Sequence, residues 1–162
     1  MFNIRRATPE DVEALVHLRL ALLREAQDLT DNTPVAALAH ATRQYLAEKI
    51  PTDEFIAWVA EVHGIIVGTS GLVFVHRPPS AQNLSGMEAY VMNMYTAPAW
   101  RGQGVATALL KEVMGFVKGT SAWRIYLHAT TDGKRIYEKA GFVAKTSEME
   151  LMLVAGASST AL

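Results

Sequence analysis

The sequence predicts an α/β domain with a mixed sheet, in which parallel and antiparallel strands occur together. An apolar run at 91–96 is followed by an apolar repeat of helical period at 105–118, and then by a second apolar run at 123–129. A strand, a helix and a further strand form a right-handed crossover, so the two strands should be parallel neighbours. Two earlier apolar runs, 55–61 and 65–75, are separated by a short turn and predict an antiparallel hairpin.

The N-terminal part predicts a strand and two helices. Residues 2–6 alternate as a strand does, and Thr8 is placed to cap a helix that runs to about residue 26. A second helix should occupy 34–50, with a proline in its first turn and another proline after its end. Arg19 lies near the edge of the first helix's apolar face. There it either extends to solvent or reaches a substrate pocket.

Two polar segments allow two interpretations each. Glu25, Asp28 and Asp31 make the junction between the two helices acidic, which is either a solvated loop or a mouth that attracts an amine cation. Residues 76–86 are rich in Pro, Ser, Asn and Gly and predict a loop. Long loops in compact domains are often functional, so this loop is either a cover for a substrate or a mobile connection.

Glu88 begins a run in which Tyr90, Met92 and Met94 share its face of a strand. A carboxylate at the start of an apolar strand is costly unless it is exposed or partnered. Glu88 is therefore either in solvent or held at a site where its raised pKa would suit a general base.

The segment between the strand at 91–96 and the following helix has two glycines, Gly102 and Gly104, next to Arg101. Glycines let the backbone turn sharply, and amides at a helix start form an anion site suited to phosphate or pyrophosphate. The alternatives are a plain strand-to-helix turn and a dinucleotide fingerprint. The fingerprint fits poorly, because Thr107 stands where its third glycine should be and the loop is too long.

The C-terminal part predicts a short helix at 134–139 and a last strand at 148–154. Residues 155–162 are small and polar, which predicts a flexible tail. We find no linker or repeat, so residues 1–154 are expected to form one domain.

The composition of the chain excludes several classes of function. The chain has 162 residues, a net charge of -1 and no cysteine. The charge gives no basic surface for nucleic acid or anionic membrane, and the missing thiols exclude an acyl-cysteine intermediate and fit a reducing cytoplasm. No stretch predicts a membrane span or a signal peptide. No pair of the five histidines has the spacing of a metal site.

Two motifs resemble the GNAT superfamily of acetyl-CoA-dependent N-acetyltransferases. The sequence RGQGVA at 101–106 is similar to the family's Arg/Gln-x-x-Gly-x-Gly/Ala signature. LHAT at 127–130, followed by GKRIYEKAGF at 133–142, looks like its C-terminal strand and short helix. The close likeness covers 90–142. One departure is that Thr130, Thr131 and Asp132 stand where many members carry an asparagine.

The resemblance implies a mostly antiparallel sheet of about six or seven strands flanked by helices. It also implies that the parallel pair, 91–96 and 123–129, splays apart to admit the pantetheine arm of acetyl-CoA. The first strand would pair with that arm, and the glycine loop would bind the pyrophosphate through its amides. The cofactor-binding residues carried over are Met94, Tyr95, Thr96, Arg101, Gly102, Gln103, Gly104, Val105, Ala106 and Thr107.

The implied reaction is direct acetyl transfer to a primary amine, by an acyltransferase of class EC 2.3.1. Tyr137 matches the family tyrosine beside the sulfur and is the candidate general acid; otherwise it is a buried aromatic whose hydroxyl bonds to backbone. Glu88 and, with less support, His128 are the candidate bases. No metal is implied.

Other readings stay open. A rival is a catalytically silent GNAT domain that binds CoA as a sensor or partner module, and a more distant one is a nucleotide-binding protein of another family. The acceptor is open among small metabolites, aminoglycoside-like amines, polyamines and peptide N-termini. Dimers are common in proteins of this kind, but the oligomeric state stays open between a monomer and a homodimer; the expected location is the cytoplasm.

Overall fold

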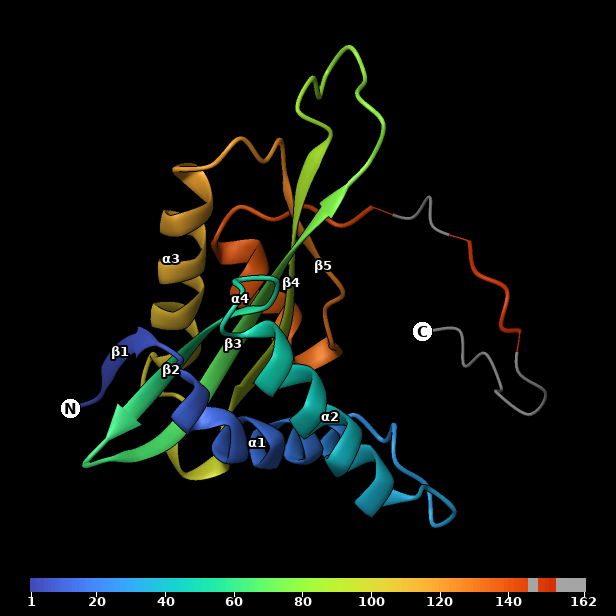
Figure 1. Cartoon of the computed structure of the whole chain (residues 1–162). Helices are drawn as coiled ribbons and strands as arrows, with labels where there is room; N and C mark the ends of the chain where they lie inside the picture. The colour runs from blue at the N-terminus through green and yellow to red at the C-terminus, as the bar shows by residue number, and fades with distance from the viewer. Residues whose placement is uncertain (146–148, 154–162) are drawn as a thin grey trace.

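The computed structural model of the chain describes residues 1–145 and 149–153. Within these residues the chain forms five strands and four α-helices (Figure 1). The elements are β1 (Asn3–Arg6), α1 (Val12–Glu25), α2 (Val35–Lys49), β2 (Ile56–Val62), β3 (Ile65–His76), β4 (Met87–Thr96), α3 (Val105–Lys118), β5 (Ile125–Leu127) and α4 (Thr131–Lys139). Short 3-10 turns, Pro9–Asp11 and Pro98–Trp100, precede α1 and follow β4.

The strands lie in sequence order, β1-β2-β3-β4-β5, in one mixed sheet. The first three pairings are antiparallel, and β4 pairs with β5 in parallel. The mixed, mostly antiparallel sheet and its one parallel pair are therefore confirmed. The strand number was wrong for the described residues, because five strands take the place of the expected six or seven.

Helices cover both faces of the sheet (Figure 1). α3 packs on one face, where its apolar stripe of Val105, Leu109 and Val113 is almost completely buried. α1 and α2 pack on the other face, over a second apolar cluster. Both faces need apolar side chains, which is why β2 is a nearly continuous apolar run.

The predicted β2–β3 hairpin is confirmed. Val62 pairs with Ile65, and the two residues between them, His63 and Gly64, have positive φ angles of 49° and 80°. Two positive φ angles are typical of the hairpin turn whose twist matches the twist of the strands. His63 is therefore a turn residue.

The C-terminal strand expected at 148–154 is not formed in the part that the structure describes, 149–153. There the large apolar side chains are exposed, Met149 at 97% and Leu153 at 89%, so the alternating pattern has no sheet face to cover. The rest of that strand and the predicted tail, 155–162, lie outside the described residues. In the described part of the chain, every helix is too short or too polar to cross a membrane.

Candidate functional site

The loop between β4 and α3 is shaped by two glycines. Gly102 and Gly104 have positive φ angles of 74° and 84°, a region that other residues rarely adopt. Gly104 also caps α3 in a left-handed conformation. A Cβ atom placed on either glycine would meet no atom within 4 Å, so the space beside the loop is open. The glycines therefore provide both the turn and the clearance that a bound group needs.

We call residues 101–107 the amide loop, after the backbone amides that gather at the start of α3. Among the described residues, the amides of 102–107 donate no hydrogen bond; the helical ladder begins with Ala108, whose amide bonds the Gly104 oxygen at 3.0 Å. The 14 residues of α3 add the positive end of a helix dipole. Such a helix start suits an anion of the phosphate or pyrophosphate type.

Within the part of the chain that the structure describes, the parallel pair is short and leaves much of β4 unpaired on one side. β5 pairs only with residues 89–91 of β4, although β4 continues to Thr96. The Ala97 amide bonds the Val67 oxygen on β3 at 2.8 Å. Because antiparallel hydrogen bonds alternate along a strand, the Thr96 amide points to the other side, where β5 has ended. This is the arrangement expected of a splayed strand pair.

A β-bulge lies in the middle of β4. Met92 pairs with Gly71 and Tyr95 with Thr69, so β4 has one residue more than β3 in this interval. Within it Asn93 has a positive φ of 54°, which asparagine tolerates better than most residues. Bulges are frequent beside active sites, because they redirect side chains. Here the bulge turns Asn93 toward α1, where its Oδ1 accepts a hydrogen bond from Arg19 at 2.7 Å.

Tyr137 lies on α4, which begins at a Thr130 cap whose hydroxyl accepts the Gly133 amide at 3.2 Å. The tyrosine is 9% exposed and its ring meets Phe142 edge-on at 5.9 Å. Among the described residues the Tyr137 hydroxyl makes no hydrogen bond. The alternative prediction, a buried tyrosine whose hydroxyl bonds to a backbone group, is therefore not seen among these residues. Burial raises the pKa of Tyr137 because it disfavours the phenolate. The hydroxyl therefore keeps its proton at neutral pH.

The structure contradicts both interpretations of Glu88, the solvent position and the site of raised pKa. It is 5% exposed, and its Oε2 accepts hydrogen bonds from Arg124 and from Arg77, each at 3.0 Å. The bond from Arg124 lowers the pKa of Glu88, and Arg77 adds to that effect against the opposing effect of burial. Glu88 is thus neither in solvent nor a carboxyl of raised pKa, and a carboxylate held by two guanidinium groups is a weak base.

His128 lies just after β5, which ends at Leu127. The prediction that His128 is a strand residue is therefore wrong. It is exposed, and its Nδ1 lies 2.9 Å from the Tyr90 hydroxyl. Across residues 1–145 and 149–153, no cluster of three or more histidine or carboxylate side chains could hold a metal ion.

The sequence analysis missed the contact that joins α1 to the amide loop. Glu25, at the end of α1, accepts hydrogen bonds from the Tyr95 hydroxyl at 2.6 Å and from the Arg101 guanidinium. The bond from Tyr95, followed by that from Arg101, lowers the pKa of Glu25. Arg101 also bonds the Thr96 oxygen at 3.0 Å. Glu25 is therefore a fixed partner of the loop and not a free carboxylate of an acidic mouth.

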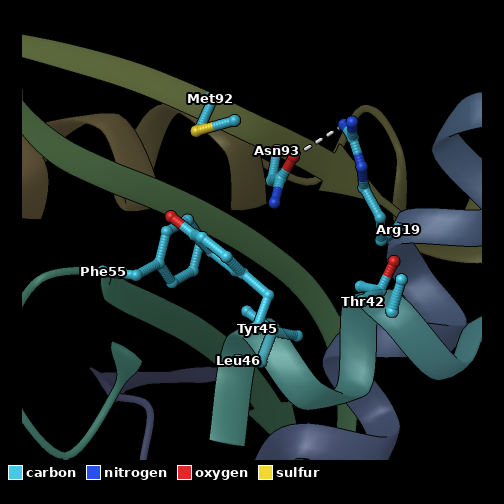
Figure 2. Close-up of a pocket in the computed structure, with 8 residues that line it drawn as sticks. Arg19, Thr42, Tyr45, Leu46, Phe55, Met92 and Asn93 are labelled. Carbon is cyan, nitrogen blue, oxygen red and sulfur yellow. Dashed lines mark hydrogen bonds between the residues drawn. The ribbon is translucent and has the colours of Figure 1, made fainter. Parts of the chain in front are cut away.

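A pocket of about 260 Å³ lies between α1, α2 and the bulge of β4 (Figure 2). We call it the Arg19 pocket. The side chain of Arg19 lines it and bonds Asn93, so Arg19 does not simply extend to solvent. The loop at 76–86 contributes no residue to it. The lining residues are Arg19, Ala41, Thr42, Tyr45, Leu46, Phe55, Met92 and Asn93.

A second hollow, of about 760 Å³, lies between α3 and α4; we call it the α3–α4 groove. Thr107, at the end of the amide loop, lines it, so the groove continues from that loop along the protein surface. Four cationic side chains and one carboxylate border it. They are Lys111, Lys118, Arg135, Lys139 and Asp132.

Comparisons with a family model and with known proteins indicate the same family. A sequence model of the acetyltransferase (GNAT) domain matches residues 53–144, more than half of the chain. The chain is 28% identical over 143 residues to the probable N-acetyltransferase family 8 member 5 of Mus musculus, covering 85% of this chain and 59% of that protein. N-acetyltransferase 8 of Rattus norvegicus is 35% identical over 81 residues, 50% of this chain and 33% of that protein. The chain thus spans between a third and three fifths of these relatives' length.

Solved structures agree over nearly the whole chain. A predicted acetyltransferase of Clostridium acetobutylicum, crystallised with acetyl-CoA, has a TM-score of 0.85 and 30% identity over 94% of this chain and 97% of its own. A GCN5-related N-acetyltransferase of Ralstonia eutropha has a TM-score of 0.84 and 25% identity, over 94% and 99%.

Proposed function

The chain belongs to the acetyltransferase (GNAT) family, and from this premise we propose that it transfers the acetyl group of acetyl-CoA directly to a primary amine. The observation that carries the proposal is the amide loop. Its unpaired amides lie at the start of α3, next to the end of β4 that β5 leaves unpaired. One surface thus offers donors for a pyrophosphate and a strand edge for the pantetheine amides that follow it.

The residues present fit the cofactor. Met94, Tyr95 and Thr96 would hold the pantetheine arm by backbone pairing. The amide loop would hold the pyrophosphate, with Arg101 beside it. The cations of the α3–α4 groove suit the remaining phosphate of the nucleotide, because the groove starts at Thr107.

Acetyl-CoA supplies a thioester, whose acyl carbon bonds to the amine nitrogen while the bond to sulfur breaks. In this proposal an outward amide at the end of β4 stabilises the negative charge that develops on the acyl oxygen. Tyr137 gives its phenolic proton to the departing sulfur, so the products are an amide and a neutral thiol. The amine loses one proton in return, and that proton restores Tyr137 through solvent.

Of the two bases that the sequence suggested, the proposal keeps His128. The arginine partners of Glu88 lower its basicity. His128 is exposed beside Tyr90, so in this proposal its ring accepts the proton that the amine loses and passes it to solvent. A base of this kind contributes about 10² to 10⁴ in rate.

The first test is calorimetric titration of the protein with acetyl-CoA, with NAD as the control ligand. We expect wild type to bind acetyl-CoA and not NAD, and Gly104→Glu to lose at least about 100-fold in affinity, because a carboxylate would occupy the anion site. Gly64→Glu is the matched control. Gly64 also has a positive φ, 80°, and open space around it, but it lies in the β2–β3 turn. It should carry the same backbone strain and keep wild-type affinity.

Turnover is measured by release of the CoA thiol across a panel of amines. The chain has no cysteine, so the protein adds no background to a thiol assay. Acetyl-CoA binding with thiol release that depends on an amine supports the proposal. Binding without turnover of any amine would instead support a CoA-binding sensor, and a folded protein that binds no acetyl-CoA would refute both.

A further inference from the structure

We propose that the Arg19 pocket is the acceptor site and that it selects a small amine bearing a carboxylate and an apolar group, an apolar amino acid in chemical terms. This inference rests on the proposed acetyl transfer. Met92 and Asn93 line the pocket and directly precede Met94, where the proposed cofactor segment begins. Successive strand residues are about 3.3 Å apart, so an acceptor in the pocket lies within reach of the acyl group.

Arg19 differs from the other arginines in its environment. Six of them, among the described residues, pair with a carboxylate. Arg24 and Arg135 have no such partner there but are exposed. Arg19 is partly buried, and within the described residues it has no carboxylate at ion-pair distance. Burial lowers the pKa of Arg19, and the charge of Asp28, which makes no hydrogen bond to it, opposes that shift only in part.

The contact with Asn93 leaves most of the guanidinium donors available. Arg19 Nη1 donates to the neutral Oδ1 of Asn93, which orients the guanidinium (Figure 2). A guanidinium carries five N–H donors in a planar fork that matches a carboxylate. A partly buried cation held by a neutral amide is therefore well placed to accept an anion from a ligand.

The rest of the pocket is mainly apolar, and the hydroxyl of Thr42, which also lines it, donates to the Leu38 oxygen at 2.8 Å. Leu46 and Phe55, each 2% exposed, form its base, and Tyr45 stands over Phe55 edge-on at 5.7 Å. Figure 2 shows Tyr45, Phe55 and Met92 around the same space that Arg19 enters. Its volume of about 260 Å³ is slightly below the usual range for ligand sites, which fits one small acceptor. Polyamines and aminoglycoside-like amines fit poorly, because Arg19 would repel their additional cationic groups.

The test compares acceptors that differ only in the carboxylate: phenylalanine with phenethylamine, and leucine with isopentylamine. In wild type we expect the amino acid to exceed its decarboxylated analogue in kcat/KM by about 10- to 100-fold, as a charge-assisted hydrogen-bonded pair allows. Arg19→Met should remove that preference while the affinity for acetyl-CoA stays unchanged. Arg24→Met, an exposed arginine on the same helix, is the matched control and should keep the preference.

Failure of this inference can be told from failure of the proposed function. If acetyl-CoA binds and amines turn over, but wild type prefers the decarboxylated analogue or Arg19→Met weakens both acceptors equally, the inference is wrong and the acetyl transfer stands. If no amine turns over, direct calorimetry with N-acetylphenylalanine tests the pocket alone. Binding that is lost in Arg19→Met supports the carboxylate site, and no binding to folded wild type overturns it.

Discussion

The amide loop follows the end of β4, whereas the Arg19 pocket is lined by Met92 and Asn93 at the β4 bulge, and the two regions are built differently. The amide loop is a single stretch of chain, 101–107, and its proposed binding groups are backbone amides. The Arg19 pocket is built from side chains of α1, α2, β4 and the residue that precedes β2. In the first region the shape of the backbone would decide what binds, whereas in the second the identity of each side chain would.

This difference indicates how the two regions divide the proposed reaction. A backbone site tolerates change in most side chains, so it suits a ligand that is the same for a whole family. A side-chain site can change its ligand through one substitution, so it suits the acceptor, which differs between enzymes. β4 serves both regions, because the bulge at Asn93 separates the part that lines the pocket from the part that begins at Met94.

The largest expected effect concerns the proposed proton donor, which belongs to neither region. Tyr137→Phe should lower kcat by about 10²- to 10³-fold, because it removes the proposed proton donor while the thiol remains a fair leaving group. The affinity for acetyl-CoA and the preference for acceptors should not change. Steady-state kinetics and calorimetry on the same samples check this. A loss of acetyl-CoA affinity as large as the loss of kcat would show that Tyr137 has a packing role instead.

Asn93→Asp should separate the two regions most clearly. It places a carboxylate against Arg19, which would then pair with the protein and not with the acceptor, and aspartate also tolerates the positive φ at this position. We expect KM for a carboxylated acceptor to rise about 10-fold, with acetyl-CoA affinity within twofold of wild type. The two regions are not separable if both affinities fall together.

Glu88→Gln should lower the free energy of unfolding of the whole domain and so affect both regions equally. The pKa of Glu88 lies below its ordinary value of 4.5, so its ion pairs stabilise the fold fully above pH 4.5 and lose that effect as the pH falls through the lower, folded-state pKa. Because its arginine partners are partly exposed, we expect a loss of about 1–2 kcal/mol at pH 7.

Urea denaturation of wild type and Glu88→Gln from pH 7 to pH 3 checks this. The difference in stability between the two proteins should shrink below pH 4.5. A difference that stays constant over this range would show that the ion pairs are not its source.

The smallest expected effect concerns the amide loop alone. Glu25→Gln removes a negative charge near the anion site and keeps a side chain that can bond Tyr95 and Arg101. Affinity for acetyl-CoA should rise about two- to fourfold at low salt, and less at high salt, because surface charges are screened. Calorimetry at two salt concentrations measures it. Weaker binding would mean that Glu25 is needed to position Arg101.

Much of the fold could be read from local rules. The α3 stripe of Val105, Leu109 and Val113 follows the helical period, and α3 occupies the predicted residues, 105–118. The turn at His63 and Gly64 was equally local. The expected strand at 148–154 failed because alternation shows only which face a strand would bury, and pairing needs a neighbour that the pattern does not contain.

Glu88 and Glu25 show where local reasoning stopped. The sequence places each carboxylate in its element, but their partners Arg124 and Arg101 are 36 and 76 residues away. A pKa depends on such distant charges as much as on burial. The sequence analysis therefore left Glu88 open between solvent and a site that raises its pKa, neither of which the structure shows, and it overlooked the contact of Glu25.

The sequence by itself determined the amide loop, because the anion site proposed there needs only glycines that permit the turn and a helix that follows, and both are encoded in consecutive residues. Only the tertiary structure decided the Arg19 pocket. Arg19 and Asn93 are 74 residues apart, and they meet because a bulge in β4 turns one side chain toward a helix packed on the sheet. The direction of a side chain depends on packing between elements, so it cannot be predicted from the position of that residue in the sequence alone.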